Sequence, residues 1–167
     1  MNNKLTRPTN LKPSLTDLSN ATTPETALNY PTILNQITEK GLAHVYAELI
    51  AVLSRGLQAF NVKQPMTPTQ IELFAEDFLD VYQYESIADL KVCLKHARLG
   101  QYGSHYQSID NLTIQTWFKL YLDEKAEARE LRHQELKTQD INGLQYATPE
   151  QLTEIKQNIY VNDYGSL

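Results

Sequence analysis

The stretch "LAHVYAELIAVLSRGLQAF", residues 42–60, decides the fold class of this chain. Its apolar residues recur at intervals of three and four, so they share one face of a helix; they are Leu42, Val45, Tyr46, Leu49, Ile50, Leu53, Leu57 and Phe60. Glycine is scarce among the 167 residues, and Leu, Ala, Glu, Gln and Lys dominate the longer segments, which favours helix over sheet. We therefore expect an all-α protein, folded as a compact helical bundle.

Three Thr-Pro pairs predict where other helices begin, because the hydroxyl caps free N–H groups and proline fits the first turn. They are Thr23-Pro24, Thr67-Pro68 and Thr148-Pro149. Gln70 and Gln151 stand at the spacing of a capping box. The helix after Thr67 carries five acidic and no basic residues up to position 85, so its outer surface is predicted to be negative.

The next two helices also have recognisable ends. Ser86, with Asp89 at capping-box spacing, is expected to start one that Gly100 ends in a left-handed conformation. Asp110 is expected to cap a long helix that contains Trp117. This helix continues into "DEKAEARELRHQELK", residues 123–137, whose mixed charge predicts a solvated extension.

Composition divides the chain into three parts. Residues 1–23 are rich in Asn, Thr, Ser and Pro, so we expect a flexible N-terminal arm. Residues 24–141 are predicted to form the helical core domain, including the long charged helix. Residues 142–167 are predicted to hold a helix breaker at Asn142-Gly143 and a short C-terminal helix.

The net charge of -5 argues against a general polyanion binder, so any nucleic-acid contact must be local. The single cysteine, Cys93, has no intramolecular disulfide partner. No apolar stretch has the length of a secretion signal or of a membrane-spanning helix. We therefore expect a cytoplasmic location and no membrane contact.

Lys91, Lys95 and Arg98 form a ridge of positive charge, because they lie four and three residues apart on the predicted helix. Phosphate pairing together with base stacking can hold single-stranded nucleic acid, so the candidate binding residues are Lys91, Lys95, Arg98, Tyr102, His105, Tyr106 and Lys119. In the alternative interpretation the ridge is a solvated face, partly paired with the acidic helix, and the tyrosines close the core. Gly100, Gly103, Asp110 and Trp117 are expected to shape the turn and its caps.

No enzyme motif accompanies these residues. The segment "GQYGSHY", residues 100–106, lacks the spacing of a phosphate-binding loop, and the four histidines lack the spacing of a zinc site. Ser104, His105 and Asp110 have no nucleophile-elbow sequence around them. We expect no catalytic activity, cofactor, metal or small-molecule substrate.

The segment from Asp89 to Lys125 resembles small proteins of unassigned function from prophages and conjugative elements of gut bacteria. The pattern is carried by Ala97, Gly100, Tyr102, Gly103, Tyr106, Ile109, Asp110, Trp117 and Tyr121. In its acidic, helical architecture with an N-terminal arm, the chain is also similar to phage helicase loaders and replication accessory proteins, although it lacks a nucleotide-binding loop. The resemblance implies a bacterial host cell and a role in DNA replication.

Two functions of different classes follow. The first is a non-enzymatic adaptor of a phage or mobile element that binds nucleic acid or a replication protein through the ridge and the Gly-Tyr-Gly turn, with Trp117 anchoring that turn. The second is an assembly protein that forms a homo-oligomer through its long charged helix.

Overall fold

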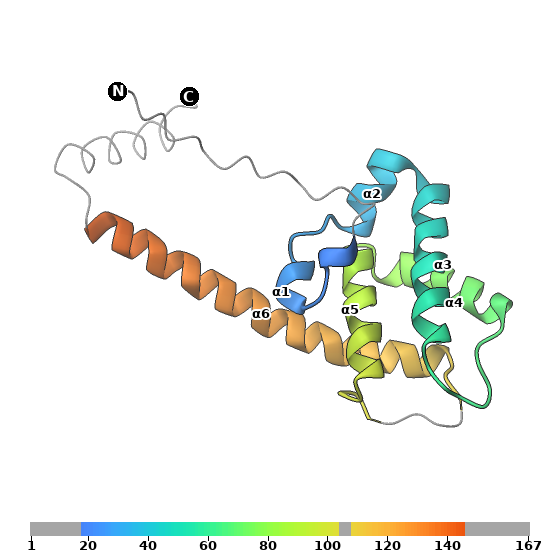
Figure 1. The fold of residues 1–167 in the computed structure, drawn as a ribbon. Coiled ribbons are helices and arrows are strands. Elements are labelled where there is room, and N and C mark those ends of the chain that lie inside the picture. Colours follow the sequence, from blue (N-terminus) through green and yellow to red (C-terminus); the bar gives the residue numbers. More distant parts are fainter. Residues whose placement is uncertain (1–17, 104–107, 146–167) are drawn as a thin grey trace. The chain divides into compact units, whose positions relative to one another are not determined.

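The computed structural model describes residues 18–103 and 108–145, and this part of the chain is all-α, as predicted (Figure 1). A single 3-10 turn, η1 (Leu18–Asn20), precedes six helices: α1 (Pro24–Ala27), α2 (Ile33–Lys40), α3 (Leu42–Gln58), α4 (Pro68–Val81), α5 (Ile87–Arg98) and α6 (Asn111–Gln145). The described residues contain no strand, and one isolated β-bridge joins Gln64 to Ser108. None of the described helices is both long enough and apolar enough to cross a membrane.

The core forms around α3, which contacts α2, α4 and α5. The predicted face of α3 is buried at Val45, Leu49, Leu53 and Leu57. Aromatic rings from α4 and α6 fill the other side: the ring centroids of Phe118 and Phe78 lie 4.8 Å apart, edge to face. The largest fully buried side chains are Trp117, Tyr121, Phe74, Phe78 and Phe118.

Local hydrogen bonds explain why the helices begin where the sequence predicts. The Thr67 hydroxyl accepts the Gln70 N–H, and the Gln70 side chain accepts the Thr67 N–H at 2.8 Å. Ser86 and Asp89 form the same reciprocal box at the start of α5. Thr23 caps α1, which is a single turn.

The predicted turn residues also have the expected geometry. Gly100 has φ +81°, and the bond from the Gln101 N–H to the His96 carbonyl completes a helix end of the Schellman type. Gly103 has φ +90°. The Asp110 carboxylate accepts the Thr113 N–H at 2.8 Å and so caps α6.

The boundaries of the predicted parts need two corrections. Ala21 is only 1% exposed and joins the core, so the arm predicted over residues 1–23 is too long by the segment from Leu18 onward. At the other end, α6 continues through Asn142-Gly143 to Gln145, because glycine inside a helix costs only about 1 kcal/mol relative to alanine. The short helix predicted after Thr148 lies outside the described residues.

The chain divides into two units after Ala128, earlier than the predicted domain end at residue 141. In the second unit the structure describes the rest of α6. Its side chains from Arg129 to Gln139 are all exposed, as expected for the mixed-charge sequence. The first unit holds the core and every residue of the site described next.

Candidate anion-binding cleft

The predicted ridge forms because α5 buries its opposite face. Leu90, Leu94 and Ala97 pack into the core, while Lys91 and Lys95 are half-buried and Arg98 is exposed. Because Lys91, Lys95 and Arg98 are four and three residues apart, the three cations lie along one side of the helix. The structure therefore places the ridge at an edge of the bundle.

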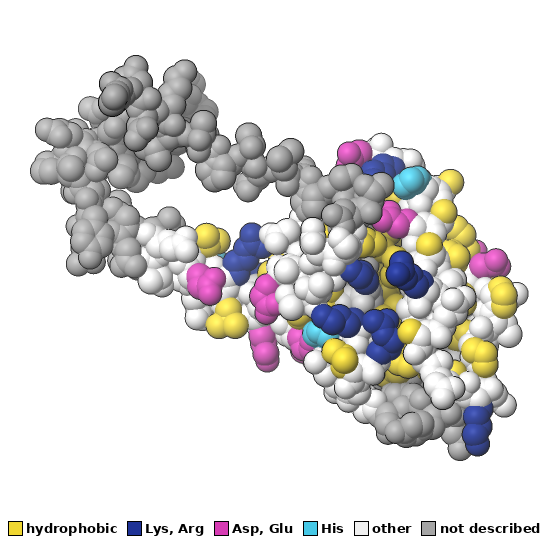
Figure 2. All heavy atoms as spheres, viewed as in Figure 1, with side chains coloured by type: hydrophobic (Ala, Val, Ile, Leu, Met, Phe, Trp, Pro, Cys, Tyr) yellow, Lys and Arg dark blue, Asp and Glu magenta, His cyan; other side chains and the backbone are white. Residues whose placement is uncertain are grey.

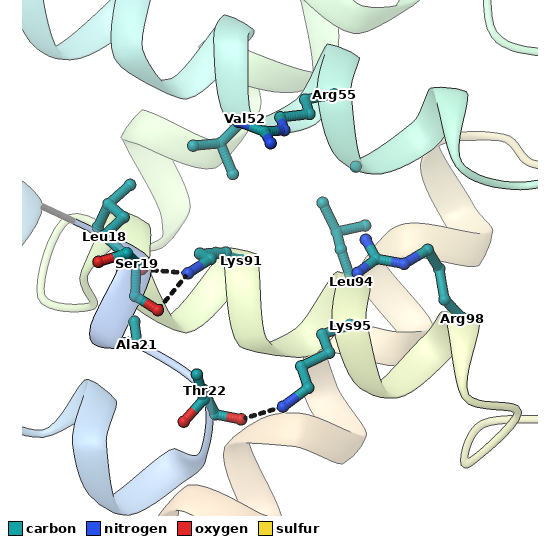
Figure 3. A pocket seen from close by; sticks show the side chains of 11 residues that line it. Leu18, Ser19, Ala21, Thr22, Val52, Arg55, Lys91, Leu94, Lys95 and Arg98 are labelled. Carbon is teal, nitrogen blue, oxygen red and sulfur yellow. Dashed lines mark hydrogen bonds between the residues drawn. The ribbon is translucent and has the colours of Figure 1, made fainter.

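A fourth cation, Arg55 of α3, faces the ridge across a cleft of about 500 Å³ (Figure 3). Two of the walls come from α3 and α5, and residues Leu18 to Thr22 form the third. Apolar side chains line the cleft between the cations, namely Leu18, Ala21, Val52 and Leu94. None of the described residues that line it is acidic. Figure 2 shows dark-blue side chains gathered around a yellow floor on this face.

The N-terminal wall is attached through the ridge itself. The Lys95 Nζ donates to the Thr22 carbonyl at 2.8 Å, and the Lys91 Nζ donates to the Leu18 and Ser19 carbonyls (Figure 3). The Thr22 carbonyl satisfies an ammonium donor of Lys95 without cancelling its charge. The described lining of the cleft therefore holds four cationic side chains, although the chain as a whole is negative.

Gly56 allows α3 and α5 to approach closely beside the cleft. A Cβ atom at this position would lie 2.6 Å from the Cδ1 atom of Leu94, which is too close for a real contact. The close approach brings Arg55, the neighbour of Gly56, near the α5 cations. Sequence analysis missed Arg55, and the available signal was that it is the single Lys or Arg residue of α3, next to a glycine.

The other predicted site residues do not line the cleft. Tyr102 is half-buried against the core, where burial, followed by the charges of Cys93 and Glu124, raises the pKa of its hydroxyl. Lys119 is exposed on α6, outside the cleft lining. His105 and Tyr106 lie outside the described residues, and so does Ser104.

Trp117 is a core residue of α6, 1% exposed. Its ring stacks on Phe60 with centroids 5.3 Å apart, so it anchors the segment that follows α3. Beside the turn, the His96 Nδ1 lies 2.7 Å from Glu124 Oε2 and joins α5 to α6.

A second polar cluster is largely buried and centres on Asp89, which is fully buried. The Lys125 Nζ lies 2.6 Å from Asp89 Oδ2 and 2.5 Å from Glu85 Oε2. The Tyr121 hydroxyl donates to Asp89 Oδ1 at 2.7 Å, and Ser86 supplies its N–H and hydroxyl. Because hydrogen bonds from all sides occupy the carboxylate, this cluster joins α5 to α6 and offers no place for a ligand.

Within the described residues, no group of three or more His, Cys, Asp or Glu side chains could hold a metal ion. No protein-family model, curated protein or solved structure matches this chain.

Proposed function

We propose that this protein is a non-enzymatic adaptor that binds nucleic acid through the phosphate backbone, in the cleft between α3 and α5. One observation carries the proposal: Arg55, Lys91, Lys95 and Arg98 surround one cleft, and none of the described residues that line it is acidic. Lys and Arg gathered at one place are the electrostatic footprint of a phosphate-binding surface.

The cleft favours backbone contacts over base recognition. None of the described residues that line it is aromatic, and Tyr102 lies outside the lining, so base stacking has no platform among these residues. Arginine and lysine pair with phosphate oxygens whatever the base sequence. We therefore expect binding with little sequence preference.

The resemblance of residues 89–125 to proteins of prophages and conjugative elements supports a role in the replication of mobile DNA. An adaptor of this kind would hold DNA by the cleft and present its other surfaces to the replication machinery. The proposal assigns no reaction to the chain itself.

Fluorescence anisotropy of labelled single- and double-stranded DNA with the full chain tests the proposal. Four phosphate contacts predict a slope of log K against log salt concentration of about -3.6 for duplex DNA, which is a loss of roughly 10²-fold between 50 and 200 mM salt. The absence of binding at low salt would refute the function.

A charge-neutral variant locates the binding. Arg55→Gln with Arg98→Gln removes two cations, so the slope should become shallower by about 1.8. Lys63→Gln with Arg132→Gln is the matched control, because it removes equal charge from exposed positions outside the cleft. Equal weakening by both variants would show that DNA is not held in the cleft.

A further inference from the structure

The outer face of α4 carries the opposite charge to the cleft. Glu72, Glu76 and Asp80 are exposed and lie four residues apart, so they form one acidic row. Leu73 and Val81 lie next to this row and are 52% and 65% exposed. The other side of α4 is fixed in the core by Phe74, Ala75 and Phe78, so the acidic row faces solvent.

The row does not neutralise the cleft of its own molecule. The ion pairs found among the described residues join Lys125 to Glu85 and Asp89, and His96 to Glu124. None of those pairs links α4 to the cleft, contrary to the partial pairing considered from the sequence. Each molecule therefore presents an acidic row and a basic cleft that do not pair with each other.

The two surfaces match in length and in composition. Glu72 to Asp80 spans about 12 Å along α4, and Lys91 to Arg98 spans about 10.5 Å along α5, at 1.5 Å of helical rise per residue. Each surface also combines charge with apolar side chains, Leu73 and Val81 on α4 and the apolar lining of the cleft. Charged rows over apolar contacts are typical of a helix bound in a groove.

We propose that the cleft of one molecule binds the acidic face of α4 of a second copy of this chain. The two surfaces differ, so the contact is head-to-tail and leaves one cleft and one α4 open at the ends, which allows chains or closed rings. The proposal shares its cleft with the proposed function but does not depend on nucleic acid as a ligand. DNA and a second copy would compete for the same cations.

Sedimentation velocity of the full chain tests this inference without DNA. At low salt the mean sedimentation coefficient should rise with protein concentration, and at about 500 mM salt the rise should disappear, because salt screens the charge pairs. Two variants each remove the charge of one surface. Arg55→Gln with Arg98→Gln removes two cations of the cleft, and Glu76→Gln with Asp80→Asn removes two acids of α4. Each should weaken association about tenfold, the effect expected from losing two exposed ion pairs.

Mixing the two variants gives the sharpest result. One retains an intact α4 and the other an intact cleft, so together they should form a 1:1 dimer through one wild-type contact, and its further growth should be about tenfold weaker than that contact. The dimer also shows that both variants are folded. A wild-type monomer at low salt, or variants that stay apart when mixed, would overturn the proposal.

The charged helix α6 provides a competing explanation that the same experiment resolves. Leu131 and Leu136 are exposed on it, 59% and 51%. If association persists in both charge variants and is lost in Leu131→Ser with Leu136→Ser, the contact belongs to α6 and the proposal is wrong. If DNA binds the cleft while the wild-type chain remains monomeric, the proposed function survives and this inference fails.

Discussion

Replacing Lys125 with methionine should destabilise the fold through the buried carboxylate of Asp89. Lys125 is 6% exposed, and its Nζ lies 2.6 Å from Asp89 Oδ2 and 2.5 Å from Glu85 Oε2. Methionine retains an unbranched chain and a similar helix propensity but removes the charge. The variant therefore leaves a buried carboxylate without the cation that contacts it.

The size of the effect follows from the hydrogen bonds that Asp89 keeps. Removing one partner of a buried ion pair costs about 3–5 kcal/mol. Asp89 retains the Ser86 N–H at 2.7 Å, the Ser86 hydroxyl at 2.8 Å and the Tyr121 hydroxyl at 2.7 Å. We therefore expect the lower end, about 3 kcal/mol, which at a urea m-value of about 2 kcal/mol/M lowers the unfolding midpoint by about 1.5 M.

Urea unfolding of the full chain, followed by Trp117 fluorescence and circular dichroism, measures this loss. Lys119→Met is the matched control: Lys119 lies on the same helix but is exposed, so its replacement should change stability by less than about 0.5 kcal/mol. Combining Lys125→Met with Asp89→Asn should cost less than the sum of the two single changes. A loss below about 1 kcal/mol for Lys125→Met, with an unchanged m-value, would refute the reasoning.

Three further predictions concern buried polar groups in the same core. Tyr121→Phe removes a hydrogen bond to a charged group and should cost about 1.5–3 kcal/mol in the same urea titration; an unchanged midpoint would contradict the bond. Burial, followed by the charge of Asp89, raises the pKa of Tyr121, so this phenol stays protonated in the folded chain while the unfolded chain ionises. Its contribution to stability is complete below about pH 10 and should fall above it by up to about 1.4 kcal/mol per pH unit, which titrations between about pH 9 and 11 would detect and a flat profile would exclude. Burial also raises the pKa of the Cys93 thiol, so Cys93 should react with a disulfide reagent only as fast as the chain opens, and rapid labelling of the native protein would contradict its burial.

The helix boundaries could be predicted because their signals are local. The pairs Thr67–Gln70 and Ser86–Asp89 satisfy free N–H groups within one turn, so a short stretch of sequence contains both partners. The signal at Gly100 is equally local, because a left-handed φ angle at the end of a helix favours glycine at that one position. The same reasoning places the basic ridge, because helical spacing alone aligns its members.

The cleft and the buried cluster could not be predicted in full, because their partners are distant in the sequence. Arg55 meets the ridge only where α3 crosses α5. Lys125 stands in a segment whose composition indicates a solvated helix, yet it lies four residues after Tyr121 and so continues the buried stripe of α6. That position was the signal for burial, but its partner Asp89 is 36 residues away.

The ridge has two roles that mutagenesis has to separate. Lys91 and Lys95 hold the N-terminal segment through its carbonyls, so replacing either changes both the charge of the cleft and one of its walls. These bonds also fix the ammonium groups before any ligand arrives, which lowers the entropy lost on binding. Arg55 and Arg98 are exposed and contribute charge without forming that wall. If replacing Arg55 and Arg98 with glutamine abolishes binding, the cleft binds its ligand by charge. If binding is lost only when Lys91 or Lys95 is replaced, the ligand depends on the wall formed by residues 18–22.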